Sequence, residues 1–342
     1  MRTITSSRLR VATLLVLTLI GIWYAVDKWR YSRMHALPEG LTSFYVGDPP
    51  PACDEWRNHM PGHRDKDAFE LYIRARRLWR SKIEWQLTKG ETQQILRDVR
   101  SAAAKGDWGA KALLAYFYRN GLGPLPSNQV LTPDADAVVA ITREAVRAGQ
   151  PWGYYDLGVA HEHGYGGAVH DQKIAWAYYL KAASLGSPEA QMALADAYSR
   201  AGIHKYAEVM HQCAFAQGHG PAARALGMTA RIEGRVQEAI HLYQEGVKMG
   251  GLSSVEVMYL FFLDGSWMTS SAAEKKELEA LNVRSDPDRA QRYESLMRAL
   301  RINPDLKFGN LDAVLPLPPL PLPEWHGVED ALSVEQEGPP AY

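Results

Sequence analysis

The residues His161-Glu162-His163 are the first place in this sequence where side chains capable of chemistry stand close together. Imidazole and carboxylate groups bind zinc, and two histidines separated by one residue can share a metal on a β-strand. The surrounding residues predict a helix instead, in which neighbours two apart point about 200° away from each other. We therefore predict no metal site and no cofactor at this motif.

Known catalytic motifs are also absent from the sequence. The His161-Glu162-His163 motif lacks the second histidine of the zinc-protease motif H-E-x-x-H. The sequence also contains neither a G-x-S-x-G elbow nor a phosphate-binding Gly-Lys-Ser/Thr loop. The glycines of Gly164–Gly167 lie between two predicted helices and make a turn. We predict that the protein is not an enzyme; a hydrolase whose acidic and histidine side chains converge only in the fold is the alternative.

The same residues belong to a helical-hairpin pattern that repeats along the middle of the chain. Periods of 32 to 43 residues separate the glycines that close each second helix: Gly106, Gly149, Gly186, Gly218 and Gly250. Such periods are typical of stacked helix pairs, since one pair cannot bury its apolar face alone. We predict an all-α fold, an α/α solenoid of four hairpins followed by a fifth, degenerate one.

The second helices are predicted from apolar residues at helical intervals. In the first repeat, Thr132 or Asp134 caps this helix after an insertion at residues 123–133, which explains the 43-residue spacing. The later second helices are expected over three segments: residues 175–185, 206–216 and 236–249. Each ends at a glycine, the residue that most readily adopts the left-handed conformation after a helix.

The composition excludes some classes of partner. At 342 residues with 46% hydrophobic content the chain can bury a large core. A net charge of −1 gives no reason to expect nucleic acid, whose phosphates demand clustered lysine and arginine. Cys53 and Cys213 match neither a metal motif nor a disulfide-rich scaffold, and the sequence leaves open whether they pair.

The amino-terminal region indicates a compartment. Residues 11–26 are sixteen positions without a charge, and three arginines precede them: Arg2, Arg8 and Arg10. As a helix this segment rises about 24 Å, short of the roughly 30 Å core of a bilayer, but Trp23 and Tyr24 suit a membrane interface. No small-residue cleavage site follows. We predict an uncleaved membrane anchor over residues 1–26, with the bulk of the chain exported.

Changes in composition predict the remaining organisation. A proline-rich spacer at residues 27–65 precedes capping helices at residues 66–105, and repeats occupy residues 106–265. Residues 266–342 combine a helix near residues 286–300 with a strap of alternating leucine and proline. Because the strap leucines need burial, we expect the strap to pack back on the solenoid; the alternative is a PxxP ligand for a separate domain.

The clearest repeat is similar to a known family. The pattern Leu157-Gly158-x-x-His161-x-x-Gly164-x-Gly166, followed by Tyr178-Tyr179-x-Lys181-Ala182-Ala183-x-x-Gly186, resembles a Sel-one-like repeat, a branch of the tetratricopeptide-like α/α repeats. The proline-rich ending resembles an uncharacterised carboxy-terminal domain that accompanies such repeats in bacterial envelope proteins. Some similar chains are immunity proteins paired with phospholipase-type toxins of type VI secretion, and the resemblance implies that role here.

The general α/α repeat geometry, applied to this chain, predicts a partner-binding concave face on the first helices. The expected residues mix aromatic and arginine side chains, a composition enriched at binding hot spots. They are Tyr116, Arg119, Asn120, Trp152, Tyr155, Val159, Glu162, His163, Met192, Asp196, Arg200, Arg224, Met228 and Arg231. Trp152 is equally compatible with the core between repeats.

These observations favour a binding protein. The leading hypothesis is an immunity protein that is anchored at the bacterial inner membrane by residues 1–26, has its bulk in the periplasm, and binds a toxin effector so as to obstruct its active site. The alternative is an envelope adaptor that holds an enzyme or signalling complex together. The oligomeric state and the identity of the partner do not follow from the sequence.

Overall fold

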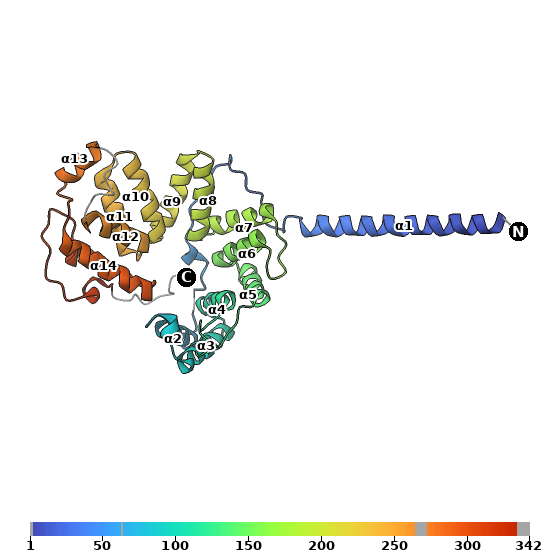
Figure 1. Ribbon diagram of the computed structural model, residues 1–342, viewed down its shortest axis with the longest axis horizontal. Coiled ribbons are helices and arrows are strands. Elements are labelled where there is room, and N and C mark those ends of the chain that lie inside the picture. Colours follow the sequence, from blue (N-terminus) through green and yellow to red (C-terminus); the bar gives the residue numbers. More distant parts are fainter. Residues whose placement is uncertain (1–2, 63, 264–271, 334–342) are drawn as a thin grey trace.

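The computed structural model describes residues 3–62, 64–263 and 272–333, without the side chains of residues 3–16 and 273. The described part is an all-α solenoid with a curved stack of helices (Figure 1). The β-structure of the described residues is a single isolated antiparallel bridge between Leu122 and Leu131. The predicted fold class, a solenoid of helical hairpins, is confirmed.

Six helical hairpins stack in the described residues. Five join consecutive helices: α2 (Lys66–Trp79) with α3 (Lys89–Ala104), α4 (Trp108–Asn120) with α5 (Ala135–Arg147), α6 (Pro151–His163) with α7 (Gln172–Ser184), α8 (Pro188–Arg200) with α9 (His204–Ala216), and α10 (Gly220–Ile232) with α11 (Val236–Lys248). The sixth pairs α12 (Leu252–Leu263) with α14 (Pro287–Ile302), and α13 (Ala272–Ala280) lies against α11. The degenerate last copy is therefore α12, and its partner is the helix predicted near residues 286–300.

The glycines that close the second helices adopt the backbone conformation expected of them. Their φ angles lie between +72° and +91°, a region that residues with a Cβ avoid: Gly106, Gly149, Gly186, Gly218 and Gly250. Asp134 also caps α5 as predicted, because its side chain accepts a hydrogen bond from the N–H of Ala137. Local signals thus fix where each hairpin turns into the next.

Two hairpins interlock through a glycine on the first helix and a tyrosine on the second. A Cβ added at Gly158 of α6 would lie 2.6 Å from the ring of Tyr179 in α7. One added at Gly227 of α10 would lie 2.6 Å from the ring of Tyr243 in α11. Since no further carbon fits between the helices, glycine sets how closely they approach.

Helix α1 (Thr3–Met34) projects away from the solenoid (Figure 1). Among the residues that the structure describes, none of the helices combines the length and the apolar character needed to cross a membrane. The anchor predicted over residues 1–26 falls largely on residues 1–16, whose side chains lie outside the described ones. The remaining part does not support it.

Residues 35–62 pack along the solenoid and do not form a free spacer. The Nδ1 atom of His35 lies 2.5 Å from a carboxylate oxygen of Asp171 at the start of α7. The ring of Phe44 stacks on Trp176 of α7 with centroids 5.2 Å apart. The segment therefore follows the second helices of the middle hairpins.

A disulfide joins this segment to the solenoid. Cys53 is bonded to Cys213 of α9, which lies 160 residues later in the chain, and the two Cα atoms are 5.4 Å apart. The two cysteines whose pairing the sequence left open therefore form a bridge. Because Cys213 is buried, the bond ties the spacer to the core of the fourth hairpin.

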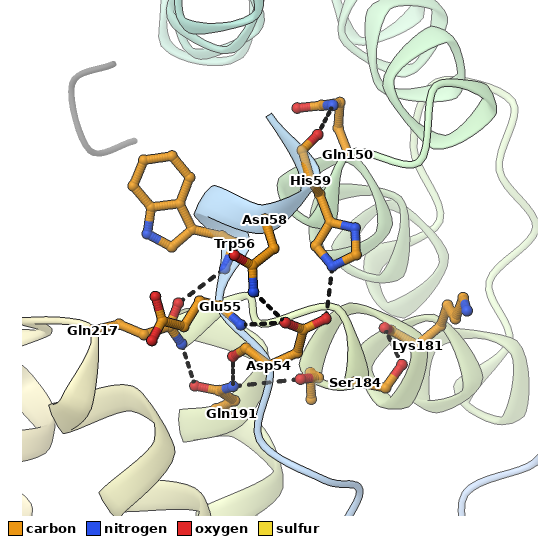
Figure 2. Close-up of polar contacts among 11 residues, drawn as sticks. Asp54, Glu55, Trp56, Asn58, His59, Gln150, Lys181, Ser184, Gln191 and Gln217 are labelled. Carbon is orange, nitrogen blue, oxygen red and sulfur yellow. Dashed lines mark hydrogen bonds and ion pairs between the residues drawn. The ribbon is translucent and has the colours of Figure 1, made fainter. Parts of the chain in front are cut away.

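Three glutamines hold the short helix η1 (Trp56–His59) against the turns between hairpins (Figure 2). The backbone N–H of Trp56 donates to Oε1 of Gln217 at 3.0 Å, and Nε2 of Gln150 donates to the carbonyl of His59 at 2.8 Å. These side chains are almost fully buried: Gln150, Gln191 and Gln217. Each glutamine side chain forms a hydrogen bond with a backbone group of residues 54–59 that packing has removed from water.

The proline-rich strap returns along the last hairpin. It includes α15 (Leu311–Val314) and η4 (Val328–Ala331), and three of its side chains are fully buried against α11, α12 and α14: Phe308, Leu311 and Leu315. Arg292 of α14 donates to the carbonyls of Val314 and Pro323, both at 2.6 Å. Of the strap leucines, Leu315 is fully buried, Leu317 and Leu322 are partly buried against the same core, and Leu320 is 60% exposed. The strap therefore packs back on the last hairpin as expected, while Leu320 remains exposed.

The first hairpin and the segment after α14 meet and close the curve of the solenoid. Arg76 of α2 donates two hydrogen bonds to Asp305, at 2.6 Å and 2.9 Å, and Nε of Arg80 lies 3.5 Å from the same carboxylate. Burial alone would raise the pKa of Asp305, but these hydrogen bonds and charges hold it below its ordinary value. A bidentate pair therefore joins residues 229 positions apart.

Replacing Gly158 by alanine should lower the free energy of unfolding by about 1–3 kcal/mol, because the added methyl group meets the ring of Tyr179. The matched control is Gly90→Ala in α3, where an added Cβ meets nothing within 4 Å. There alanine should raise the free energy of unfolding by about 0.5–1 kcal/mol. Urea denaturation followed by circular dichroism measures both, and equal effects would contradict the steric interpretation.

Replacing Cys53 and Cys213 by serine should lower the free energy of unfolding by roughly 3–5 kcal/mol, because the bond spans 160 residues of the unfolded chain. Reduction should bring the wild type to the stability of the variant, which itself should not respond to the reductant. Urea titrations with and without dithiothreitol test this. An unchanged wild-type midpoint after reduction would show that the bond does not stabilise the fold.

Candidate partner-binding groove

The surface between the first helices α8, α10 and α12 is hollowed into a groove of about 630 Å³. We call it the α8–α10–α12 groove. Its lining includes the large apolar side chains Met192, Met228, Val257 and Leu260, together with Asp196, Arg224, Glu256 and His211. A hollow of mixed apolar and charged character is suited to holding a protein segment.

Helical spacing explains how α10 supplies one wall of this groove. Arg224, Met228 and Arg231 are four and three residues apart, so they share one face of the helix. Ala223, Leu226 and Ala230 lie on the opposite side of the helix and are buried. The face left open by hairpin formation is thus the one that carries the arginines and the methionine.

The groove offers open charges beside an apolar floor. Within the described part of the chain, Asp196 and Arg224 take part in no ion pair, whereas Glu256 lies 3.7 Å from Arg301. Met228 is 38% exposed, so part of its apolar side chain is accessible to a partner. Arginine and flexible apolar side chains are enriched at protein interfaces, so this surface is suited to a protein partner.

His211 forms a buried edge of the groove. It stands seven residues before its closing glycine, at the position where the neighbouring hairpins have Tyr179 and Tyr243. The residue is 8% exposed, and burial lowers the pKa of its imidazole, while the charge of Asp196 offsets only part of this. The groove therefore presents a neutral imidazole where other hairpins are filled by a larger ring.

The residues predicted for the concave face on α8 and α10 lie in or beside the groove. Four of them line it: Met192, Asp196, Arg224 and Met228. Arg200 is exposed at the end of α8, and Arg231 pairs with Glu274 of α13. The structure thus gathers part of the predicted set at one place and covers the last arginine with α13.

The predicted residues of α6 lie outside the groove. Tyr155 is partly buried, with its ring 5.4 Å from that of Tyr179. Glu162 accepts a hydrogen bond from the Tyr179 hydroxyl at 2.5 Å, Val159 is partly buried, and His163 is exposed. They form a neighbouring surface in which the carboxylate of Glu162 already has a partner within the hairpin.

The predicted residues of α4 are farther along the same side. Tyr116 is 43% exposed, and its ring lies 5.3 Å from that of Trp79. Nη2 of Arg119 lies 2.9 Å from Asp156 of α6, and Asn120 donates to the carbonyl of Tyr116 at 3.0 Å. This ion pair joins adjacent hairpins, so Arg119 contributes to the contact between them.

The prediction of Trp152 as a partner-binding residue is wrong. It is 6% exposed and is buried with Ala115 and Ala145, and its ring lies 6.5 Å from that of Trp108. Side chains on a helix lean toward its amino terminus. A large residue in the first turn of α6 therefore points back onto the preceding hairpin and away from the concave face.

The two histidines of the H-x-H motif point to different surroundings, as helical spacing predicted. The imidazole Nδ1 of His161 lies 2.9 Å from the carbonyl oxygen of Val169, and its ring stacks on Tyr178 with centroids 5.4 Å apart. His163 is exposed at the end of α6. The first histidine thus has a structural role in the turn between helices.

The sequence did not reveal the contribution of α12 to the groove. Glu256, Val257 and Leu260 lie in a helix whose residues are apolar almost all round, so the hydrophobic period does not distinguish its faces. His211 was missed as well. Its register seven residues before Gly218 was the available signal, since the smaller side chain there leaves space between hairpins.

Solved structures resemble this chain over most of its length. Pseudomonas aeruginosa 5086 (PA5086) matches with a TM-score of 0.62 and 27% identity, covering 80% of this chain and 97% of that chain. The immunity protein Pa5087 of Pseudomonas aeruginosa matches with a TM-score of 0.61 and 26% identity, covering 80% and 96%. This chain is similar to bacterial immunity proteins. Immunity protein PA5088 of the same organism shares the fold, with a TM-score of 0.60, 24% identity and coverage of 79% and 95%.

A family model matches the carboxy-terminal region. Residues 261–340 match the domain of unknown function DUF6396. A comparison with curated proteins found no match. The expected resemblance to immunity proteins is confirmed, and the region that matches the family model contains the strap that covers the last hairpin.

The free energy of unfolding should decrease as the pH falls below about 6.5, because the unfolded chain binds a proton at His211 before the folded chain does. His211→Asn removes this contribution and should reduce the slope between pH 6.5 and pH 5, while His161 and His219, whose pKa values burial also lowers, maintain the remainder. Urea midpoints of both proteins across this interval measure the slope. A variant with the same slope as the wild type would contradict the buried neutral imidazole.

Proposed function

We propose that this chain is an immunity protein that binds a toxin and covers the active site of that toxin. The observation that carries the proposal is the likeness to immunity protein Pa5087, at 26% identity over 80% of this chain and 96% of that one. Steric obstruction needs a shaped surface and no chemistry, which agrees with the binding character of the groove.

The α8–α10–α12 groove is the proposed contact surface. Its floor supplies apolar side chains such as Met228, and its rim supplies Asp196 and Arg224, whose charges are open to a partner. A buried apolar anchor surrounded by polar contacts is how most interfaces concentrate their binding energy. The surrounding surfaces of α4 and α6 extend the proposed interface along the solenoid.

The proposed place of action is the bacterial periplasm, with delivery by the N-terminal segment. The disulfide between Cys53 and Cys213 supports this, since such bonds form and persist in oxidising compartments. Both cysteines of the sequence are used in it. The proposed toxin is a phospholipase-type effector of type VI secretion, which rests on the family resemblance of the sequence.

Protection from the toxin tests the proposal. The candidate is the product of the reading frame next to this gene, directed to the periplasm of a host bacterium; exported wild-type protein should restore growth and bind the purified toxin. Met228→Arg should weaken binding at least tenfold, because a charge then occupies the apolar floor of the groove. Calorimetry measures the affinity.

Val209→Arg is the matched control, because Val209 is an exposed apolar residue on the second helix α9 and does not line the groove. This variant should protect as the wild type does. Failure of the exported wild-type protein to bind or to protect would overturn the proposed function. Equal losses in both variants would overturn the groove as the contact surface.

A further inference from the structure

One polar side chain of the α8–α10–α12 groove is buried and lacks a hydrogen-bond partner. His211 is 8% exposed and lines the groove, and in the portion of the chain that the structure describes its ring takes part in no hydrogen bond, ion pair or ring contact. A neutral imidazole carries one N–H donor and one acceptor nitrogen. Leaving both unpaired away from water costs free energy, so the groove contains a polar group that a bound partner can satisfy.

The hairpins on either side show why this imidazole is left without a partner. In each of them a glycine of the first helix faces a tyrosine of the second: Gly158 with Tyr179, and Gly227 with Tyr243. In the fourth hairpin, Ala195 follows a leucine as these glycines do, and His211 has the register of the tyrosines. A Cβ at either glycine would lie 2.6 Å from the tyrosine ring. Because Ala195 has that Cβ, the shorter imidazole fits where a phenol ring would not.

The surroundings of His211 define the chemistry of a matching group. Met192 and Met228 line the groove together with apolar side chains of α12, and thioethers make favourable contacts with aromatic rings. The carboxylate of Asp196 is close enough for its charge to act on the imidazole, and within residues 3–62, 64–263 and 272–333 it forms no ion pair. A matching group is therefore apolar over most of its surface and carries one hydrogen-bonding atom.

We propose that the groove binds a tyrosine side chain of the protein partner, with its ring against the two methionines and its hydroxyl at His211 and Asp196. The phenol oxygen accepts from the imidazole N–H and its own O–H donates to the carboxylate, so both polar groups gain a partner. A lysine would also pair with Asp196, but the charge of Arg224 in the same groove disfavours an ammonium. This inference rests on the proposed function and names the group by which the toxin is held.

Side-chain analogues test the site without a toxin. p-Cresol, toluene and butylamine correspond to the side chains of tyrosine, phenylalanine and lysine. Added to the purified full chain with ¹⁵N-labelled histidine, p-cresol should shift the nuclear magnetic resonance signals of His211. It should bind at least threefold more tightly than toluene, because a site that hydrogen-bonds a hydroxyl rejects the analogue without one. Unchanged His211 signals, equal affinity for toluene, or tighter binding of butylamine would each overturn the proposal.

Two single variants test the assigned hydrogen bond. Asp196→Ala should reduce the affinity for p-cresol to that for toluene, because the hydroxyl loses its acceptor. The matched control is Glu256→Ala, which removes a carboxylate of the same groove that already lies 3.7 Å from Arg301. The control should leave the affinity for p-cresol unchanged, and equal effects of the two variants would contradict the assignment.

A double variant occupies the site while keeping the hairpin packed. Ala195→Gly with His211→Tyr gives the fourth hairpin the glycine–tyrosine pair of its neighbours, so its urea midpoint should match that of the wild type. It should no longer bind p-cresol and should bind the toxin at least tenfold more weakly. Undiminished toxin binding by this variant would overturn the tyrosine site and leave the proposed function standing. Failure of the wild type to bind the toxin would instead contradict the proposed function, while the analogue titration still decides the chemistry of the groove.

Discussion

A pair of short helices can bury apolar side chains only where another pair covers them, and this constraint shapes the whole molecule. In the interior, each hairpin is covered by its neighbours, and glycines such as Gly158 and Gly227 let the two helices of a hairpin approach closely. The ends of the stack need other solutions. The α2–α3 pair covers the first repeat, and the proline-rich strap places Phe308 and Leu315 in the core of the last hairpin.

The solenoid is held together by contacts beyond those between neighbours. The Arg76–Asp305 pair joins its two ends, and the segment from His35 to His59 connects its middle hairpins from outside. Because the closing turns bury Gln150 and Gln217, the backbone of this segment replaces the water that these turns would otherwise bind. Such long-range contacts make the stack more rigid than nearest-neighbour contacts alone would. A rigid groove loses less conformational entropy when it binds a partner.

The parts of the fold that depend on local chemistry were predictable from the sequence. Closing glycines and the cap Asp134 fix the helices because their backbone preferences act within a few residues. Non-local outcomes were not predictable. Nothing near Cys53 shows that Cys213 is its neighbour, and nothing near Trp152 shows that the preceding hairpin leaves room for its ring.

The candidate groove shows the same division. Helical spacing placed Arg224 and Met228 on one open face of α10, since that follows from the period of the helix. The wall supplied by α12 and the edge at His211 follow from how hairpins stack, and a nearly uniformly apolar helix does not reveal this in sequence. Their contribution became visible only once the hairpins were stacked.

The disulfide also determines how tension would travel through the molecule. A pull on α1, with a partner held in the α8–α10–α12 groove, would reach Cys53 and pass directly into α9 through the bond to Cys213. The load would then act on the middle of the stack as shear, and the helices from α2 to α5 would lie outside its path. Without that bond the same pull would act on the hydrogen bonds that Gln217 and Gln150 form with η1.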